Sequence, residues 1–383
     1  MVNNSKGEIL YVGGFNFDKN YASSIRVIEN ARFFQTLNYN VKILGKITLK
    51  NEANSLLIKN IEVFDIETSK FDFASDISPI KSKVESSLKK IDYIIAYNYP
   101  PIAFFKLLKY CSSKNIVLIP DLTEWYGIDG KFTVMKGMRL ILNEWRMFVL
   151  NKKCNNFILA SSYLNNKYKN SNSLLLPFVT IDELKKVQPN ILDRKNVNFV
   201  YAGSPGKNFS KDRLDIIIKA FARVKTNQNN FTLKIVGLTL SDLLKETIIK
   251  EDVIKLADNL ICYGRVDNEL CVSIIKQSNF VVFARDINRV TCAGYPTKVF
   301  EAFKYGLPVI TNKTSDIELH VNSSNGFMLE KADVKEFQNC IGTILSSEIE
   351  ALETIINNCR ENNPFLAKYY KRNTEHFFKN IIQ

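Results

Sequence analysis

Residues 285–311 read RDINRVTCAGYPTKVFEAFKYGLPVIT. An apolar run at 280–284 precedes this stretch and another begins at Leu307, so the pattern predicts a strand, a turn, a helix and a second strand. We expect the turn at 294–296 and a helix that Thr297 caps. A helix that starts there lies at the carboxyl edge of a parallel sheet, which is where α/β folds bind ligands.

Charged side chains gather around this predicted helix start. Arg285, Arg289 and Lys298 lie within a few residues of it, and the backbone N–H groups and the helix dipole also attract a phosphate. Glu301 follows one turn into the helix, where a carboxylate can accept hydrogen bonds from two vicinal hydroxyls. The stretch therefore predicts a site for a diphosphate with an adjoining ribose.

Short apolar runs alternate with amphipathic segments along the whole chain, which predicts an α/β protein. Two series of strands and helices indicate two doubly wound, Rossmann-like domains that face a central cleft, and the cleft is the expected active site. We place the first domain at 1–185, the second at 186–362, and at 363–383 a last helix that we expect to cross back to the first domain. The predicted strands are 8–12, 40–44, 61–64, 93–96, 116–119 and 157–160, then 198–202, 233–236, 260–262, 280–283 and 308–311.

The composition is that of a globular protein, with 383 residues, 46% of them apolar and 24% charged. The net charge is +13, and residues 1–180 hold most of the excess, with 24 basic and 15 acidic side chains. We rank an anionic membrane surface above nucleic acid as the partner, because the segment 136–153 sets Trp145 and Phe148 among basic residues, as interfacial helices do. An amphipathic core helix with a solvated basic face is the alternative.

The sequence favours neither a metal nor a cofactor. Its seven cysteines form no CxxC pair and show no metal-like spacing with either histidine, so we expect reduced thiols. The first residues lack the apolar length of a signal peptide, and no apolar stretch is long enough to span a bilayer. We therefore expect a cytoplasmic protein.

A glycine loop follows the first predicted strand of the second domain, where 201–211 reads YAGSPGKNFSK. Gly203 and Gly206 would allow a ligand to approach the backbone closely, and Lys207 and Lys211 add cations suited to the same diphosphate. A purely structural turn is the alternative.

The corresponding loop of the first domain, 13–24, begins with Gly13 and Gly14, which we expect to admit the substrate. It reads GGFNFDKNYASS and lacks the spaced GxGxxG of dinucleotide enzymes, so a nicotinamide cofactor is poorly supported.

Acids and aromatic rings follow another predicted strand of the first domain, in the segment 119–130, IPDLTEWYGIDG. Asp121 or Glu124 could bind an acceptor hydroxyl or assist its deprotonation, and Trp125 and Tyr126 could stack on a sugar ring. The alternative is a strand-end turn in which Asp121 caps a helix and Trp125 lies in the core. Both histidines, His320 and His376, lie after residue 185, so the segment 1–185 offers no histidine base.

Together these motifs resemble the GT-B glycosyltransferases, and among them glycosyltransferase family four and its relatives in bacterial surface polysaccharide assembly. The motifs that carry the resemblance are the glycine loop and helix at 13–37, EWY at 124–126, AGSPGK at 202–207, YGRV at 263–266 and AGYPTKVFEAFKYGLPVI at 293–310.

The resemblance implies that the second domain binds a nucleotide sugar and that transfer retains the anomeric configuration and needs no metal. It assigns Glu301 to the ribose as the second of two signature glutamates, while Ala293 stands at the position of the first. Lys207 and Arg285 would stabilise the departing nucleoside diphosphate. The predicted donor-binding residues are Gly203, Ser204, Gly206, Lys207, Lys211, Arg265, Val266, Arg285, Arg289, Gly294, Tyr295, Pro296, Thr297, Lys298 and Glu301.

On the acceptor side, Glu124 ranks ahead of Asp121 as the group that acts on the acceptor hydroxyl, and Gly13, Gly14, Trp125 and Tyr126 are predicted to bind the acceptor. The sequence thus predicts a glycosyltransferase that moves a sugar from a nucleoside diphosphate to a lipid-linked surface glycan at the inner face of the cell membrane. Two alternatives stay open: a sugar-nucleotide epimerase on the same fold, and a non-catalytic nucleotide-sugar-binding partner subunit.

Overall fold

The computed structural model describes residues 5–17, 22–47, 55–66, 74–127, 133–184, 192, 196–226 and 231–382. The chain divides into two compact units. The first unit comprises Met1–Glu183, Ala293–Tyr295 and Phe365–Gln383, and the second comprises Leu184–Cys292 and Pro296–Pro364. The boundary predicted at residue 185 lies outside the described residues.

The described part of the first unit contains an eight-stranded sheet in the order β3-β4-β2-β1-β5-β6-β7-β8. Neighbouring strands are parallel except β3 and β4, which pair in the antiparallel sense. The strands are β1 (Glu8–Asn16), β2 (Asn40–Lys46), β3 (Ser55–Ile58), β4 (Ile61–Asp65), β5 (Tyr93–Tyr97), β6 (Val117–Leu122), β7 (Asn156–Leu159) and β8 (Asn172–Leu175). The sequence did not predict β3 or β8.

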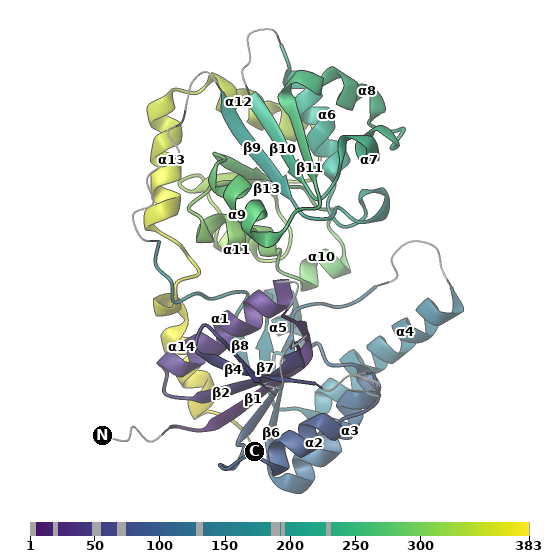
Figure 1. Ribbon diagram of the computed structural model, residues 1–383, viewed down its shortest axis with the longest axis vertical. Coiled ribbons are helices and arrows are strands. Elements are labelled where there is room, and N and C mark those ends of the chain that lie inside the picture. The colour runs from purple at the N-terminus through teal and green to yellow at the C-terminus, as the bar shows by residue number, and fades with distance from the viewer. Residues whose placement is uncertain are drawn as a thin grey trace. The chain divides into compact units, whose positions relative to one another are not determined.

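Helices cover both faces of this sheet (Figure 1). Alternate residues of β1 show the arrangement, because Leu10 belongs to one apolar core while Tyr11 belongs to the other. Phe34 and Phe378, from helices far apart in the sequence, meet in the second of these cores. The helices are α1 (Ala22–Thr36), α2 (Ser78–Glu85), α3 (Pro101–Lys114), α4 (Val134–Trp145), α5 (Ser162–Lys167) and α14 (Ala367–Lys379), with a π-helical turn at Arg146–Leu150.

Among its described residues the second unit holds a six-stranded parallel sheet in the order β11-β10-β9-β12-β13-β14. Its strands are β9 (Val197–Ala202), β10 (Phe231–Val236), β11 (Leu260–Gly264), β12 (Phe280–Val282), β13 (Val309–Asn312) and β14 (Gly326–Leu329). Its helices are α6 (Leu214–Val224), α7 (Leu240–Leu244), α8 (Lys250–Lys255), α9 (Asn268–Lys276), α10 (Arg289–Ala293), α11 (Thr297–Lys304), α12 (Val334–Ser346) and α13 (Ile349–Glu361). The sequence did not predict β14. The two sheets confirm the predicted α/β class with two Rossmann-like units.

Two local predictions were wrong. Gly13 and Gly14 lie inside β1, because the strand continues to Asn16 and Gly13 pairs with Tyr97 of β5. Thr297 is the first residue of α11 and its side chain caps nothing, since the helix starts after Pro296. Within the described part of the chain, no helix combines the length and apolarity needed to cross a bilayer.

Candidate active site

A buried carboxylate joins two cations at the carboxyl edge of the second sheet. Asp212 is fully buried before α6. Its Oδ1 accepts a hydrogen bond from Arg285 Nε at 2.8 Å, and its Oδ2 accepts one from Lys298 Nζ at 2.8 Å and one from the Tyr201 hydroxyl at 3.0 Å. Although burial raises it, the charges of Lys298 and Arg285 hold the pKa of the Asp212 carboxyl well below its usual range. The cluster therefore carries one surplus positive charge.

Arg285 is fixed at its backbone as well as at its side chain. The Asn312 amide, at the end of β13, accepts from the Arg285 N–H and donates to its carbonyl, each at 2.9 Å. The guanidinium uses Nε for Asp212, and among the described residues its two terminal nitrogens have no hydrogen-bond partner. Those nitrogens can bind two phosphate oxygens at once, since a guanidinium presents parallel N–H donors.

The glycine loop after β9 leaves room for the second cation. Gly203 has φ +134°, and a Cβ there would lie 2.7 Å from Lys298 Nζ. A side chain at this position would therefore displace the amino group and strain the backbone. Gly206 also has a positive φ, of 78°, and in the same loop Ser204 and Lys207 are exposed.

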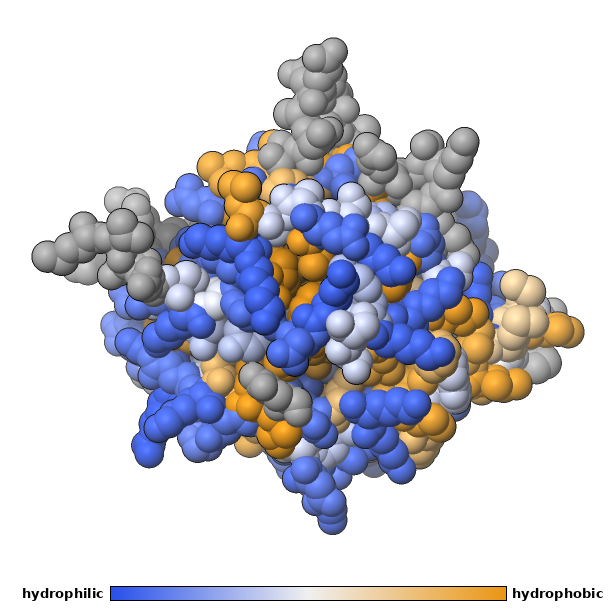
Figure 2. Space-filling view, turned by 90° about the horizontal axis from the view of Figure 1, so that it is seen from below, coloured by the Kyte–Doolittle hydropathy of each residue, from blue (hydrophilic) through white to orange (hydrophobic). Residues whose placement is uncertain are grey.

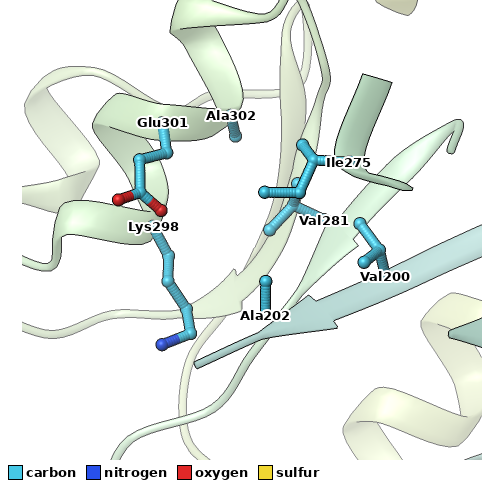
Figure 3. Close-up of a pocket in the computed structure, with 7 residues that line it drawn as sticks. All are labelled: Val200, Ala202, Ile275, Val281, Lys298, Glu301 and Ala302. Atoms are coloured by element: carbon cyan, nitrogen blue, oxygen red, sulfur yellow. The ribbon is translucent and has the colours of Figure 1, made fainter. Parts of the chain in front are cut away.

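Lys298 and Glu301 line a small pocket together with apolar side chains. Figure 3 shows both charged side chains extending from α11, with Val200 and Ala202 of β9 and Val281 of β12 across from them. Burial raises the pKa of Glu301 above its usual value, against the opposing charges of neighbouring lysines. Glu301 thus places a hydrogen-bond acceptor beside the cations, as a ribose site requires.

Four further predicted donor residues have side chains that are exposed or half-buried. Lys211, which precedes Asp212, is exposed. Arg265 and Val266 follow β11, where Arg265 is exposed and Val266 is half-buried. Arg289 is exposed on α10.

Gly294 and Tyr295 are grouped with the first unit. Tyr295 is 6% exposed and packs edge-on against Phe178 and Phe365. Because its ring is buried in protein contacts, Tyr295 is corrected from a ligand-binding residue to a packing residue. Pro296 is buried at the start of α11 and provides no side-chain cap.

Asp121 is also corrected, because it is fully buried within the first unit. It accepts a hydrogen bond from Arg26 Nη2 at 2.9 Å and another from the Tyr11 hydroxyl. Arg26 donates further to the backbone carbonyls of Leu176 and Pro177. A carboxylate held in this way balances a buried arginine and cannot meet an acceptor from solvent.

Trp125 lies in the core, as the alternative interpretation stated. It is 5% exposed, and its Nε1 donates to Glu144 at 3.0 Å. Lys167 lies over its ring, 4.3 Å from the centroid. Glu124 and Tyr126, by contrast, are exposed on either side of it. Of the predicted acceptor-side groups in this segment, these two are the ones open to a ligand.

Sequence reasoning missed Asp212 and Asn312. Asp212 follows a lysine at the start of a helix, where an acid ordinarily indicates only a favourable dipole contact. Asn312 closes an apolar strand and gives no signal of its own. Across the described residues, no group of three or more histidine, cysteine or acidic side chains is placed to hold a metal ion.

The decisive comparison concerns residues 196–347, which match a family model described as Glycosyl transferases group 1. This region is a group 1 glycosyltransferase domain. The match confirms the predicted resemblance and the predicted class of enzyme, a glycosyltransferase that uses a nucleotide-sugar donor. None of the curated proteins searched matches the chain.

Solved structures share the fold over nearly the whole chain. Sucrose-phosphate synthase from Thermosynechococcus elongatus aligns with a TM-score of 0.70 and 14% identity, covering 98% of both chains. HepE from Anabaena, in complex with UDP and glucose, aligns at 0.65 and 16%, covering 98% of this chain and all of its own. WaaG, a glycosyltransferase involved in lipopolysaccharide biosynthesis, aligns at 0.63 and 10%, covering 96% and 98%. At these identities the likeness establishes the GT-B fold.

Proposed function

We propose that this chain is a retaining, metal-independent glycosyltransferase. It moves a sugar from a nucleoside diphosphate to a lipid-linked glycan acceptor in surface polysaccharide biosynthesis, and it works at the cytoplasmic face of an anionic membrane. The observation that carries the donor side is the pair of cations, Arg285 and Lys298, held by Asp212 next to Glu301.

Each of these groups has a defined task in the proposal. The terminal nitrogens of Arg285 and the ammonium of Lys298 bind the diphosphate, and Glu301 accepts hydrogen bonds from the ribose hydroxyls. During transfer the bond between the anomeric carbon and the diphosphate oxygen breaks, and negative charge grows on the diphosphate. Positioned cations stabilise that charge more strongly in the transition state than in the bound donor.

The acceptor side needs no enzyme nucleophile in this scheme. The acceptor oxygen forms its bond to the anomeric carbon on the face that the diphosphate leaves, and the departing phosphate oxygen takes the acceptor's proton. Glu124, exposed after β6, binds the acceptor hydroxyl and orients it. HepE binds UDP and glucose, which supports a nucleoside diphosphate sugar as the donor. WaaG takes part in lipopolysaccharide biosynthesis, which supports a surface glycan as the acceptor.

Nucleotide binding tests the donor site directly. Calorimetry with UDP, GDP and ADP on the full chain should give binding for one of them, and Arg285→Ala should weaken it at least about tenfold, which corresponds to one charge-assisted hydrogen bond. Arg223→Ala is the matched control, because Arg223 is exposed at the end of α6. Equal losses in the two variants would contradict the site.

Product analysis separates the proposal from its rivals. A glycosyltransferase releases nucleoside diphosphate from the matching nucleotide sugar faster when a glycan acceptor is added, and it does so in the presence of EDTA. An epimerase would convert the nucleotide sugar into its epimer without release. A binding subunit would bind the nucleotide and release nothing with any acceptor.

A further inference from the structure

Helix α4 presents apolar side chains to solvent. Val134, Met135, Met138 and Ile141 have exposed fractions of 79%, 60%, 52% and 70%. They recur at helical spacing, and Phe148, 47% exposed on the following π-helical turn, extends the row. In Figure 2 orange side chains gather at the right edge, the side toward which α4 projects in Figure 1. We call these five residues the α4 surface.

Polar residues on the inner side of the same segment hold the α4 surface outward. Arg146 is buried and donates to the backbone carbonyl of Tyr99 at 2.9 Å and to Asn143 Oδ1 at 3.0 Å. Asn143 donates to the backbone carbonyl of Tyr126 at 3.2 Å. A rotation of the helix that buried its apolar row would break these bonds and expose carbonyls that they satisfy. The outward apolar face is therefore built into the fold.

Basic residues surround the α4 surface. Arg139 is exposed within α4, and Lys152 and Lys153 are exposed just after it. Lys106 and Lys109 are exposed on α3, which contacts α4. An apolar row with a basic border matches an anionic lipid surface, in which acyl chains lie beneath phosphate headgroups.

We propose that the α4 surface docks on an anionic lipid bilayer, with its apolar side chains inserted among the headgroups and its basic border on lipid phosphates. The inference deepens the membrane part of the proposed function and does not depend on sugar transfer. A second copy of this chain fits less well. Two α4 surfaces placed face to face would bring Arg139 of each copy together, and the acid in α4, Glu144, already accepts a hydrogen bond from Trp125.

Vesicle flotation with the full chain tests the docking. The vesicles contain either phosphatidylcholine alone or an equal mixture of phosphatidylcholine and phosphatidylglycerol. We expect binding to the mixed vesicles only. The double variant Met138→Ser with Ile141→Ser should bind them about tenfold more weakly, and Arg139→Gln about fivefold more weakly. These side chains are exposed, so the variants should keep the wild-type Tm.

The matched control is Ile248→Ser, which removes an apolar side chain that is 55% exposed in the second unit and should leave vesicle binding unchanged. UDP affinity, measured on the same variants, should equal that of the wild type, so a failure of the donor site is recognised separately. Equal binding to both kinds of vesicle, or a double variant that binds like the wild type, would overturn the proposal. A dimer that the double variant dissociates, with vesicle binding unchanged, would assign the surface to self-association instead.

Discussion

Replacing Asp212 by asparagine tests the central feature of the site, the carboxylate that holds two cations. The carboxylate has one oxygen for Arg285 and one for Lys298, each 2.8 Å away. An asparagine keeps one acceptor oxygen and turns the other position into a donor that faces a cation. One of the two cations therefore loses its anchor, and its place in the transition state is no longer fixed.

The magnitude follows from that one lost bond. A hydrogen bond to a charged group contributes about 1.5 to 3 kcal/mol, so kcat should fall roughly tenfold to hundredfold. The free energy of unfolding should fall by about 2 kcal/mol, which for a chain of 383 residues lowers Tm by roughly 2 to 3 °C. UDP affinity should not fall, because the substitution removes a negative charge next to the phosphates.

The assay is release of nucleoside diphosphate at varied donor concentration, with calorimetry of UDP binding alongside. A loss confined to kcat identifies Asp212 as a positioning residue, since a residue that only supports the fold would lower Tm without changing the rate of the folded enzyme. Asp258→Asn is the control, because Asp258 pairs with Lys225 at the exposed surface, 3.1 Å away. A variant with wild-type kcat, or one whose whole loss lies in KM, would refute the reasoning.

Three further predictions concern the pocket and pH. Gly203→Ala should lower the free energy of unfolding by about 1 to 2 kcal/mol, because of the positive φ, and should weaken UDP binding several-fold by displacing Lys298 Nζ, which calorimetry measures. Because burial raises the pKa of Glu301, UDP affinity should begin to fall on acidification at a higher pH than for an ordinary glutamate, and Glu301→Gln should remove that part of the pH dependence. Burial lowers the pKa of His320 to about 4, so the unfolded chain binds the proton more readily. The part of the free energy of unfolding that depends on neutral His320 should therefore be lost as the pH falls from about 6.5 to about 4. Urea titrations should show a smaller loss of stability over this pH range for His320→Asn.

The predictions for Gly203, Glu301 and His320 each have a control or a contrary result. Gly342 lies in α12 with nothing within 4 Å of a Cβ, so Gly342→Ala should leave UDP binding unchanged and raise stability by about 1 kcal/mol. The diphosphate itself titrates, so the pH result for Glu301 is the difference between wild type and variant. If UDP affinity changed with pH in the same way for wild type and Glu301→Gln, the assignment of this pH dependence to Glu301 would be contradicted. For His320, identical acid losses in wild type and variant would be the contrary result.

The sequence could indicate that several of the proposed donor-side groups share one edge of the second sheet, because parallel strands bring their carboxyl ends to one edge. Arg285 ends one strand, the loop with Gly203 follows another, and the helix with Lys298 and Glu301 starts between two strands. The order of strands and helices along the chain therefore predicts that these groups lie at the same edge of the sheet. The sequence could not predict that Asp212 is the carboxylate that pairs with these cations, because Asp212 lies 73 residues before Arg285 in the chain.

The orientation of the side chains in the segment after β6 could not be predicted from the sequence, because this segment mixes polar and apolar residues and only packing decides which of them face inward. Asp121 faces inward to a buried arginine, and Trp125 faces inward to the core, while Glu124 between them faces solvent. The glycines at the end of β1 were assigned to a loop, but strand pairing with β5 extends through Gly13. Pairing partners that lie far along the chain are not visible in local composition.

Repulsion between two neighbouring cations explains why an acid stands in a site proposed for an anion. Both cations contact one carboxylate, so they lie roughly 5 Å apart, and two like charges at that separation repel by about 3 kcal/mol at an effective dielectric of 20. Asp212, which is fully buried, offsets this repulsion from one side, and the terminal nitrogens of Arg285 have no hydrogen-bond partner among the described residues. A bound diphosphate offsets it from the other side. Saturating UDP should therefore narrow the Tm difference between wild type and Asp212→Asn. An equal Tm difference with and without UDP would mean that Asp212 does not act as the counter-ion of the two cations.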